Sequence, residues 1–336
     1  MDKLYIVTGG YGHLGNTVVK ELVRRGQTVR ALVLPTDKST SLDGYTVEVI
    51  KGNVCDALSL EALFKTKEPR HVIVIHTAGI VTIASKFQQI VYDVNVTGTK
   101  NIIAQCLKHK VEKLVHVSSV HAIPEIANRG FIKEVAHFNK DEVFGLYAKT
   151  KAEATQAVLD SVKDGLDAVV VNPSGIIGPY DYGHGHITQL IMDYLDGRLT
   201  SGIDGGYDFI DVRDVANGVL SAAQKGRAGE CYILSGGFHT IRELLGTLHK
   251  VSGKRKIKSF LPIWFVKLTA PLAEIYYKFL KQPPLFTKYS LYTLASNSNF
   301  SNKKAVDELG FTTRDFSETL NDTVKWLREN NRVKKK

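Results

Sequence analysis

The sequence predicts an α/β fold: a doubly wound parallel sheet with helices on both faces and a smaller C-terminal region. Three observations predict it. Short, β-branched and almost continuously apolar runs recur through the first half of the 336 residues, as in strands buried on both faces. Amphipathic stretches of helical length separate these runs. A glycine cluster follows the first run directly, at the point where a strand would turn into a helix.

The elements are expected in the order of these runs. The first strand, LYIVTG at 4–9, precedes an amphipathic stretch at 16–25 that predicts the first helix. Further helices are expected at 93–109 and 147–163, and a strand at 166–179 follows them. Strand–helix–strand units at this spacing are right-handed, so the sheet should be parallel. The other apolar runs predict strands at 28–34, 46–52, 71–79 and 113–119.

The regular pattern loosens after residue 179, which divides the chain into two regions. Residues 1–179 should form mainly the sheet domain, completed by part of 205–240. Residues 180–204 and 241–330 should form mainly a second region that lies over the carboxyl edge of the sheet and binds substrate, and 331–336 is a basic tail.

Two helix starts are readable in the second half of the chain. Thr240 and Glu243, three residues apart, form a capping box that opens a helix. Asp214 is expected to cap the helix that follows the strand around FIDV.

Composition narrows the class of protein. Hydrophobic residues make up 43% of the chain, enough for a sizeable core. The three cysteines, at 55, 106 and 231, show neither pairing nor metal-ligand spacing, which favours a reducing compartment. Met1 is followed by a charged residue and a strand instead of an apolar leader, and no apolar run reaches membrane-spanning length. We therefore expect a cytoplasmic protein.

The formal net charge of +10 arises in the last quarter of the chain. Residues 250–336 hold 18 Lys and Arg against 7 Asp and Glu, and they end in RVKKK. No nucleic-acid-reading module accompanies this charge. We therefore expect a solvated basic tail and no nucleic-acid partner.

The glycine cluster, TGGYGHLG at 8–15, has the spacing of a phosphate-binding turn. Gly9 would allow the tight turn, Gly12 a close approach to the ligand, and Gly15 close packing of the helix. The helix N-terminus then offers N–H groups and a partial positive charge to a pyrophosphate. A bare strand-to-helix turn is the alternative. The position in the first βαβ unit favours a Rossmann-type dinucleotide-binding domain.

A second motif, Tyr147-Ala-Lys-Thr-Lys151, supplies groups for proton transfer. Residues four apart on a helix share a face, so the phenol and the ammonium should stand together. A nearby Lys favours the phenolate, and we therefore expect a lowered pKa for Tyr147 and a role as general acid or base. Ser118 or Ser119, at the end of the strand VHVSS, could polarise a carbonyl oxygen, although either serine alone would suit a turn.

Together these motifs resemble the extended short-chain dehydrogenase/reductase superfamily, the branch of NAD(P)-dependent epimerases, dehydratases and reductases. Within it, the chain is similar to dihydroflavonol-reductase-like and hydroxysteroid-dehydrogenase-like reductases. The resemblance covers nearly the whole chain. Besides the glycine turn, VHVSS and the Tyr147–Lys151 motif, it rests on HTAG at 76–79, VNVTGTKNII at 94–103, NPSGIIGP at 172–179 and FIDVRDVA at 209–216.

The resemblance implies a role for each matching residue. Ser119 would hydrogen-bond the substrate carbonyl, Tyr147 would exchange the proton of the alcohol, and Lys151 would hold the nicotinamide ribose. Hydride transfer is the chemistry of the cofactor itself. At position 53 the family usually has Asp where this chain has Asn. The residues implied in cofactor binding are Gly9, Gly12, His13, Leu14, Gly15, Leu34, Lys38, Asn53, Val54, Thr77, Ala78, Gly79, Asn95, Lys151, Pro173 and Ser174.

The end of the second strand bears on the choice of cofactor. NAD-preferring relatives usually carry an acidic residue there and NADP-preferring ones often carry Arg, but this chain has Val33 and Leu34. The missing acid removes a repulsion against a ribose phosphate, which Lys38 could reach. We therefore expect NADP(H) to be preferred over NAD(H).

The resemblance implies an NAD(P)(H)-dependent oxidoreductase that reduces an aldehyde or ketone, or oxidises the secondary alcohol, of a mainly apolar small molecule. An NAD-dependent sugar-nucleotide epimerase or dehydratase is the alternative, weakened because Tyr207 stands where such enzymes hold the diphosphate with Arg. A non-catalytic dinucleotide sensor or scaffold is a further alternative, disfavoured because both Tyr147 and Lys151 are retained. A homodimer stays open.

Three other features receive structural or minor roles. The apolar, aromatic stretch at 261–286 is expected to roof the substrate pocket, with contact to an anionic membrane surface as the alternative. His184 and His186 lack a nearby third ligand, so no metal site is expected. The acidic residues around the FIDV strand are explained by a helix cap and by pairing with Arg213; they are Asp204, Asp208, Asp211 and Asp214.

Overall fold

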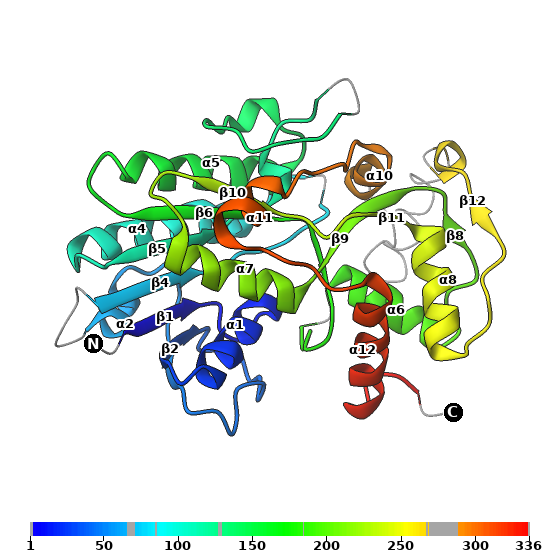
Figure 1. The fold of residues 1–336 in the computed structure, drawn as a ribbon, viewed down its shortest axis with the longest axis horizontal. Coiled ribbons are helices and arrows are strands. Elements are labelled where there is room, and N and C mark those ends of the chain that lie inside the picture. The colour runs from blue at the N-terminus through cyan, green and yellow to red at the C-terminus, as the bar shows by residue number, and fades with distance from the viewer. Residues whose placement is uncertain are drawn as a thin grey trace.

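Parallel strands form the main sheet, in the order β10-β6-β5-β4-β1-β2-β3 (Figure 1). The computed structural model describes residues 3–65, 71–84, 86–126, 130–183, 185–266, 268 and 288–334. The strand order reverses beside β1, which lies between β2 and β4, and this confirms the doubly wound α/β fold. The strands are β1 (Leu4–Thr8), β2 (Thr28–Val33), β3 (Glu48–Lys51), β4 (Val72–His76), β5 (Lys113–Val117), β6 (Ala168–Pro173) and β10 (Cys231–Leu234).

Helices cover both faces of this sheet because successive strand residues point to opposite sides. Tyr5 and Val7 of β1 belong to the core under α1 and α7, whereas Ile6 belongs to the core under α4 and α5. In Figure 1, α4 and α5 lie above the sheet and α1 and α7 below it. Helices are present where they were predicted, at 16–25, 93–109, 147–163 and after the FIDV strand. Their bounds are α1 (His13–Arg24), α4 (Gly98–Lys108), α5 (Leu146–Ser161) and α7 (Val212–Lys225).

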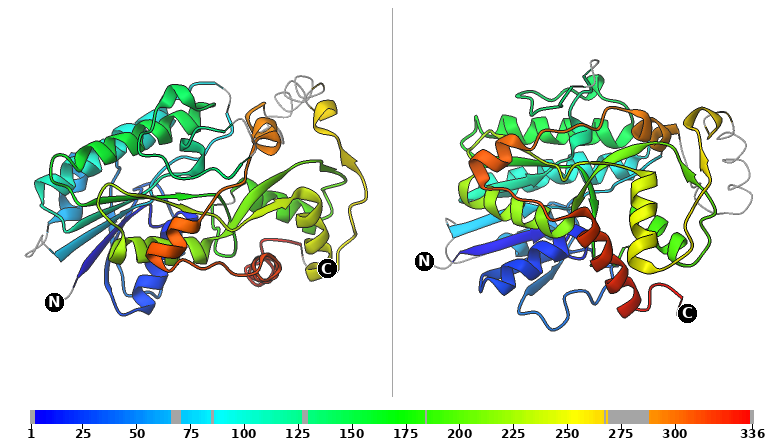
Figure 2. Two further views of the ribbon diagram at one scale, coloured as in Figure 1. Left: turned by 45° about the horizontal axis from the view of Figure 1, so that its top comes forward. Right: turned by 45° about the vertical axis from the view of Figure 1, so that its right-hand side comes forward.

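The second region lies beyond the carboxyl ends of the strands, at the right of Figure 1. Its own core joins aromatic and aliphatic residues of its sheet to α6, α8 and α12. The turned views of Figure 2 show α8 (yellow) and α12 (red) in this region. The capping box at the start of α8 is confirmed, with Thr240 and Glu243 bonded reciprocally. Its elements are β7 (Gly175–Ile177), β8 (Gly202–Ile203), β9 (Gly206–Asp211), β11 (Phe238–Thr240), β12 (Phe260–Leu261), α6 (His186–Leu195), α8 (Ile241–Ser252), α10 (Lys288–Ala295) and α12 (Phe316–Glu329).

The strand expected over 166–179 is divided in two. β6 stays in the main sheet, and after Ser174 the chain continues as β7, which pairs with β9 in a three-stranded sheet. A Cβ on Gly175 would lie 2.9 Å from both the Asp208 carbonyl oxygen and the Tyr207 ring. The glycine therefore lets β9 approach β7 closely, and this approach separates the two strands.

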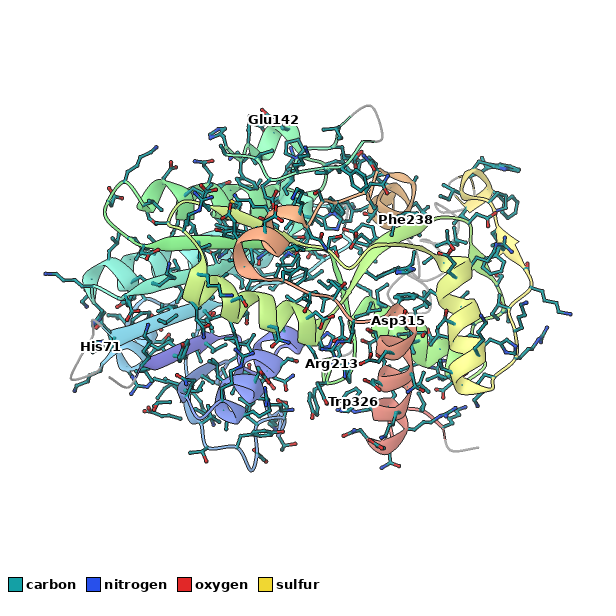
Figure 3. All side chains as sticks on the ribbon, viewed as in Figure 1. His71, Glu142, Arg213, Phe238, Asp315 and Trp326 are labelled. Atoms are coloured by element: carbon teal, nitrogen blue, oxygen red, sulfur yellow. The ribbon has the colours of Figure 1, made fainter. Side chains whose placement is uncertain are left out.

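The prediction that Asp214 caps α7 is wrong. Asp211, the last residue of β9, is the N-cap, and its side chain accepts a hydrogen bond from the Arg213 backbone N–H at 2.7 Å. Asp214 lies in the first turn and instead accepts bonds from Arg314. Arg213 also donates to Asp322 of α12 at 2.6 Å, so it lies between α7 and α12 (Figure 3).

Short helical segments complete the described part of the chain. A π-helical turn precedes α4, so the predicted helix at 93–109 begins with irregular geometry. Cys55, Cys106 and Cys231 are free thiols. Within the described residues, no helix is both long and apolar enough to cross a membrane. The remaining segments are Leu58–Leu60, α2 (Glu61–Phe64), α3 (Gln89–Tyr92), Asp93–Thr97, Val120–Ala122, Lys140–Glu142 and α11 (Lys303–Leu309).

Candidate active site

The glycine turn between β1 and α1 has a backbone that side chains do not cover. Gly9 has φ +71°, a left-handed conformation, and its carbonyl oxygen accepts from the Gly12 N–H at 2.9 Å. A Cβ on Gly15 would lie only 2.1 Å from that same carbonyl oxygen. Gly12 is the exposed N-cap of α1 and brings no capping side chain. The first amides of α1 thus face the turn without a side-chain acceptor, which suits a pyrophosphate.

Two neighbouring residues tie the turn to the second region. His13 is hydrogen-bonded through Nε2 to the Pro179 carbonyl oxygen at 2.9 Å, and Asn16 Nδ2 donates to the Tyr180 carbonyl oxygen at 3.0 Å. Leu14, in the first turn of α1, is buried in the core between that helix and the sheet. Among the residues expected around the pyrophosphate, His13 and Leu14 therefore have structural contacts of their own.

The loop after β2 contains both residues that bear on cofactor choice. Leu34 is 50% exposed, and Lys38 is exposed four residues later. Burial raises the pKa of Tyr11 in the glycine turn, and the carboxylates of Asp43 and Asp37 raise it further. Asp37 and Asp43 therefore lie near the glycine turn. The sequence did not predict this, because the end of β2 itself carries Val33 and Leu34 in place of an acidic residue.

Asn53 and Val54 follow β3 and form a short loop at the same edge of the sheet. The Asn53 side-chain oxygen accepts from the Cys55 N–H at 3.0 Å, an Asx-turn. Val54 is buried against Gly98, and its carbonyl accepts from Asn101 at 2.9 Å. Asn fits this turn as Asp would, because either side chain offers the accepting oxygen.

The loop after β4 is held at both ends by side-chain hydrogen bonds. Thr77 Oγ1 donates to the Thr8 carbonyl oxygen at 2.6 Å, which joins this loop to the glycine turn. Asn95 accepts from the Ile80 N–H and donates to the Ile80 carbonyl, at 2.8 and 3.0 Å. Thr77, Ala78 and Gly79 are thereby fixed where the first and fourth strands end side by side.

The two serines after β5 have different surroundings. Ser118 Oγ lies 2.5 Å from Thr155 Oγ1 inside the sheet–α5 interface. Ser119 Oγ accepts from the His121 N–H at 3.2 Å, and Ser119 acts on the Tyr147 phenol by lowering its pKa. Ser119 is therefore the serine that faces the candidate catalytic group.

Tyr147 and Lys151 share the face of α5 that packs on the ends of the strands. Both are buried, at 8% and 6% exposure. Lys151 Nζ donates to the Val117 carbonyl oxygen at 2.7 Å, and burial lowers the pKa of Lys151 to about 8. A Cβ on Gly79 would lie 3.6 Å from Lys151 Nζ, so the loop after β4 reaches this ammonium.

The prediction of a lowered Tyr147 pKa is wrong in this structure. Burial raises the pKa of Tyr147 to about 12, and the hydrogen bond from Ser119 acts only partly against it. Desolvation disfavours the charged phenolate more than the neighbouring groups favour it. Tyr147 is consequently a neutral phenol, which is the form that can give its proton to a developing alkoxide.

A cluster of aromatic side chains beside Tyr147 was not found from the sequence. The His121 ring meets the Tyr147 ring edge-on at 5.8 Å and stacks on the Tyr207 ring at 5.6 Å. His121 Nε2 lies 2.9 Å from the Tyr207 hydroxyl, and His121 Nδ1 lies 3.2 Å from the Tyr289 hydroxyl. These residues come from three distant segments, so no local pattern could have revealed them.

Pro173 and Ser174 lie at the end of β6, where the chain leaves the main sheet, and they border the candidate site on that side. Ser174 N–H donates to the Leu234 carbonyl at 3.0 Å, which fixes the turn toward β7. Asp208 lies beside Ser174, and burial raises the pKa of this carboxyl group. Ser235 Oγ donates to Asp208 at 2.5 Å and so satisfies part of the buried carboxylate.

The other sequence features have simpler surroundings. Asp211 and Asp214 pair with Arg213 and Arg314, which agrees with the structural role expected for the acidic cluster. His184 lies outside the described residues, as do 267 and 269–286 of the apolar stretch. In the described part of that stretch, Trp264 is 67% exposed and Val266 is buried.

Comparison with known proteins decides the family. The model of the NAD-dependent epimerase/dehydratase family matches residues 5–234. The chain belongs to this family. Its glycine turn, the Ser119–Tyr147–Lys151 set and the loops after β3 and β4 all lie within the matched part, so the extended short-chain dehydrogenase/reductase resemblance is confirmed. The protein is thus an oxidoreductase-family enzyme that depends on a nicotinamide dinucleotide.

Individual relatives extend over nearly the full chain. A sterol demethylase protein B of Methylococcus capsulatus is 31% identical and covers 96% of this chain and 98% of its own length. A Stigmatella aurantiaca ketoreductase, named for a farnesyl-bearing 3-oxo-dihydroquinoline oxide, is 29% identical over 92% of this chain and 91% of its own. The crystal structure of gox2253 has a TM-score of 0.85, 27% identity and coverage of 99% and 100%.

Proposed function

We propose that this member of the epimerase/dehydratase family is a carbonyl reductase or alcohol dehydrogenase acting on an uncharged, mainly apolar small molecule. The observation that carries the proposal is the Ser119–Tyr147–Lys151 arrangement, in which Tyr147 and Lys151 are buried on one face of α5 and Ser119 acts on the neutral phenol by lowering its pKa. The nicotinamide cofactor supplies or accepts hydride when it is bound. In reduction Ser119 orients the carbonyl oxygen, and the Tyr147 hydroxyl gives that oxygen its proton.

The surroundings of Tyr147 support an uncharged substrate. Tyr207 replaces the cation that sugar-nucleotide enzymes use for the diphosphate, and its pKa is raised well above the usual value by burial. Carboxylates of Asp208 and Glu125 add to that rise. A diphosphate would meet phenols and carboxylates here instead of a guanidinium. The names of the relatives, a sterol demethylase protein and a ketoreductase of a farnesyl compound, point the same way.

For the cofactor we propose a preference for NADPH over NADH. Leu34 leaves the ribose without an acidic partner at its expected position, and Lys38 is exposed nearby. Asp37, the acid next to Lys38, accepts a bond from the Ser39 N–H at 2.9 Å and so caps its own turn. Replacing Lys38 by Ala should weaken NADPH binding about three- to tenfold, as expected for one charged contact, and should leave NADH binding unchanged. Fluorescence titration with each cofactor measures this, and equal effects on both would contradict the preference.

A panel of aldehydes, ketones, steroids and sugar nucleotides, followed by NAD(P)H absorbance, tests the proposed reaction. We expect NADPH consumption with apolar ketones or aldehydes. Turnover of UDP-glucose without net change of cofactor would instead establish the sugar-nucleotide alternative, which the family also includes. Tight dinucleotide binding without any turnover would favour a sensor or scaffold. Cytoplasmic location, homodimer formation and the pocket-roofing role of 261–286 stay predictions.

A further inference from the structure

His121 borders both hydroxyl-bearing members of the candidate catalytic set. Among the described residues, the ring that contacts the Tyr147 ring is that of His121, which meets it edge-on at 5.8 Å with an interplanar angle of 72°. Ser119 acts on the Tyr147 phenol, and Ser119 Oγ accepts from the His121 backbone N–H at 3.2 Å. The position of the imidazole therefore bears directly on where the phenol stands.

The orientation of the His121 ring is fixed by two phenols of the second region. Nε2 lies 2.9 Å from the Tyr207 hydroxyl of β9, and Nδ1 lies 3.2 Å from the Tyr289 hydroxyl of α10. Burial lowers the pKa of His121 to about 4, so the imidazole is neutral, with one N–H donor and one accepting nitrogen. One phenol must therefore donate to the ring while the other accepts from it. Rotation of the imidazole would break these hydrogen bonds.

The two phenols are themselves held by the fold. Tyr207 and Tyr289 are buried, at 8% and 5% exposure, and the Tyr207 ring stacks on the His121 ring at 5.6 Å. The Tyr289 ring lies on the backbone of Gly145, where an added Cβ would come within 2.4 Å of ring carbon Cε2. Gly145 is the N-cap of α5, the helix that carries Tyr147. Tyr289 thus packs against the start of the catalytic helix and bonds the imidazole that contacts its phenol.

These contacts give His121 a positional effect on Tyr147 and leave it no chemical one. Both ring nitrogens are already bonded to phenols, so neither is free to exchange a proton with Tyr147. The neutral ring also carries no charge that would stabilise a phenolate. What it can do is keep the Tyr147 ring where its hydroxyl reaches the substrate oxygen, and a displacement of about 1 Å can cost about 10²-fold in rate.

We propose that His121 is a positioning residue that holds the Tyr147 ring in place for proton transfer and is itself oriented by Tyr207 and Tyr289. The inference rests on the proposed function, because it assigns His121 a part in the proton transfer of Tyr147. It makes β9 and α10 part of the catalytic arrangement, since both act on the phenol through one imidazole. No contact of His121 with substrate is required.

Three variants separate the imidazole from the phenols that orient it. His121→Phe keeps a ring but removes both nitrogens. The double variant Tyr207→Phe/Tyr289→Phe keeps every ring and removes the two hydroxyls. A triple variant combines all three changes. If the phenols act through His121, the triple variant should behave as His121→Phe alone, whereas independent effects would add in free energy and multiply in rate.

NMR of protein labelled with ε-¹³C tyrosine reads the position of Tyr147 without cofactor or substrate. Comparison with Tyr147→Phe assigns its signal. We expect the double variant to shift this signal, because the released imidazole turns and changes its ring current on Tyr147. In the His121→Phe background, removal of the same two hydroxyls should leave the signal where it is.

The same comparison is then made in turnover, with a ketone that wild type reduces with NADPH. We expect kcat to fall about 10- to 100-fold in His121→Phe and in the double variant, through displacement of Tyr147. KM should change less than about threefold, because no contact with substrate is lost. The kcat of the triple variant should equal that of His121→Phe, and the NADPH dissociation constant should be the same in all variants.

His239→Phe is the matched control. His239 lies in β11, and its ring stacks on the Phe316 ring at 3.8 Å, away from Tyr147. This variant also exchanges an imidazole for a phenyl ring, but it should leave the Tyr147 signal and kcat at their wild-type values. Circular dichroism and thermal unfolding confirm that each variant folds.

The outcomes separate the inference from the proposed function. A Tyr147 signal that ignores the loss of the two hydroxyls overturns the inference, as does an equal shift in both backgrounds. Losses of kcat that multiply in the triple variant, or losses that appear in KM, would indicate direct contact of the phenols with substrate and would also contradict it. If wild type reduces no ketone, the proposed function fails, while the NMR comparison still decides whether Tyr207 and Tyr289 position Tyr147 through His121.

Discussion

Replacing Gly15 by Ala tests whether the turn after β1 holds the cofactor. The new Cβ would lie 2.1 Å from the Gly9 carbonyl oxygen and 2.7 Å from Thr77 Oγ1, both far inside contact distance. Relief requires the turn to move, and with it the bond between Gly12 N–H and the Gly9 carbonyl oxygen. Overpacking of this kind costs about 1–3 kcal/mol. We expect urea unfolding to show that loss, and fluorescence titration to show NADPH binding at least about tenfold weaker.

Gly246→Ala is the control for this prediction. Gly246 lies inside α8, and an added Cβ there would meet nothing within 4 Å. The variant should be stabilised by about 1 kcal/mol, because Ala favours a helix interior over Gly, and its cofactor binding should not change. If Gly15→Ala binds NADPH as tightly as wild type, the turn does not cradle the cofactor and the reasoning from its geometry fails.

Two further predictions concern buried charges. Burial depresses the pKa of Lys151 to about 8, below its unfolded value of 10.5, so its ammonium destabilises the fold below pH 8 and this penalty disappears as pH rises to 10.5. Lys151→Met should therefore raise the free energy of unfolding by about 2 kcal/mol at pH 7, after allowing for the lost bond to Val117, with the gain shrinking toward pH 10.5 in urea titrations; a constant gain would contradict it. Arg314→Ala should cost about 3–5 kcal/mol in urea unfolding because it leaves the buried Asp214 carboxylate without its partner. Arg24→Ala, from an exposed pair, should not shift the urea midpoint, and equal effects of the two variants would refute the argument.

The elements that were predictable from the sequence are those that local patterns determine. Buried parallel strands read as continuous apolar runs, and the helix period places Tyr147 and Lys151 on one face whatever the rest of the chain does. The glycine turn has a fixed spacing for the same local reason. The sequence did not predict that the chain leaves the main sheet after β6 and continues as β7 in a second sheet, because this depends on the contact of Gly175 with β9.

Long-range packing explains what the sequence could not reveal. His121 and Tyr207 are 86 residues apart, and His121 and Tyr289 are 168 apart, so their cluster depends on the completed fold. The direction of the Tyr147 pKa shift likewise depends on burial, which the spacing to Lys151 does not report. Asp211 and Asp214 both suit a helix start, and only the end of β9 decides that Asp211 is the cap.

The central claim is that Tyr147 exchanges the proton in a carbonyl reduction. The most direct measurement is the turnover of Tyr147→Phe on a ketone that wild type reduces, together with its NADPH dissociation constant. Loss of the phenol hydroxyl should lower kcat about 10²–10⁴-fold, because a positioned general acid contributes that much, while cofactor binding stays nearly intact. Wild-type turnover in this variant would show that Tyr147 is not the proton donor.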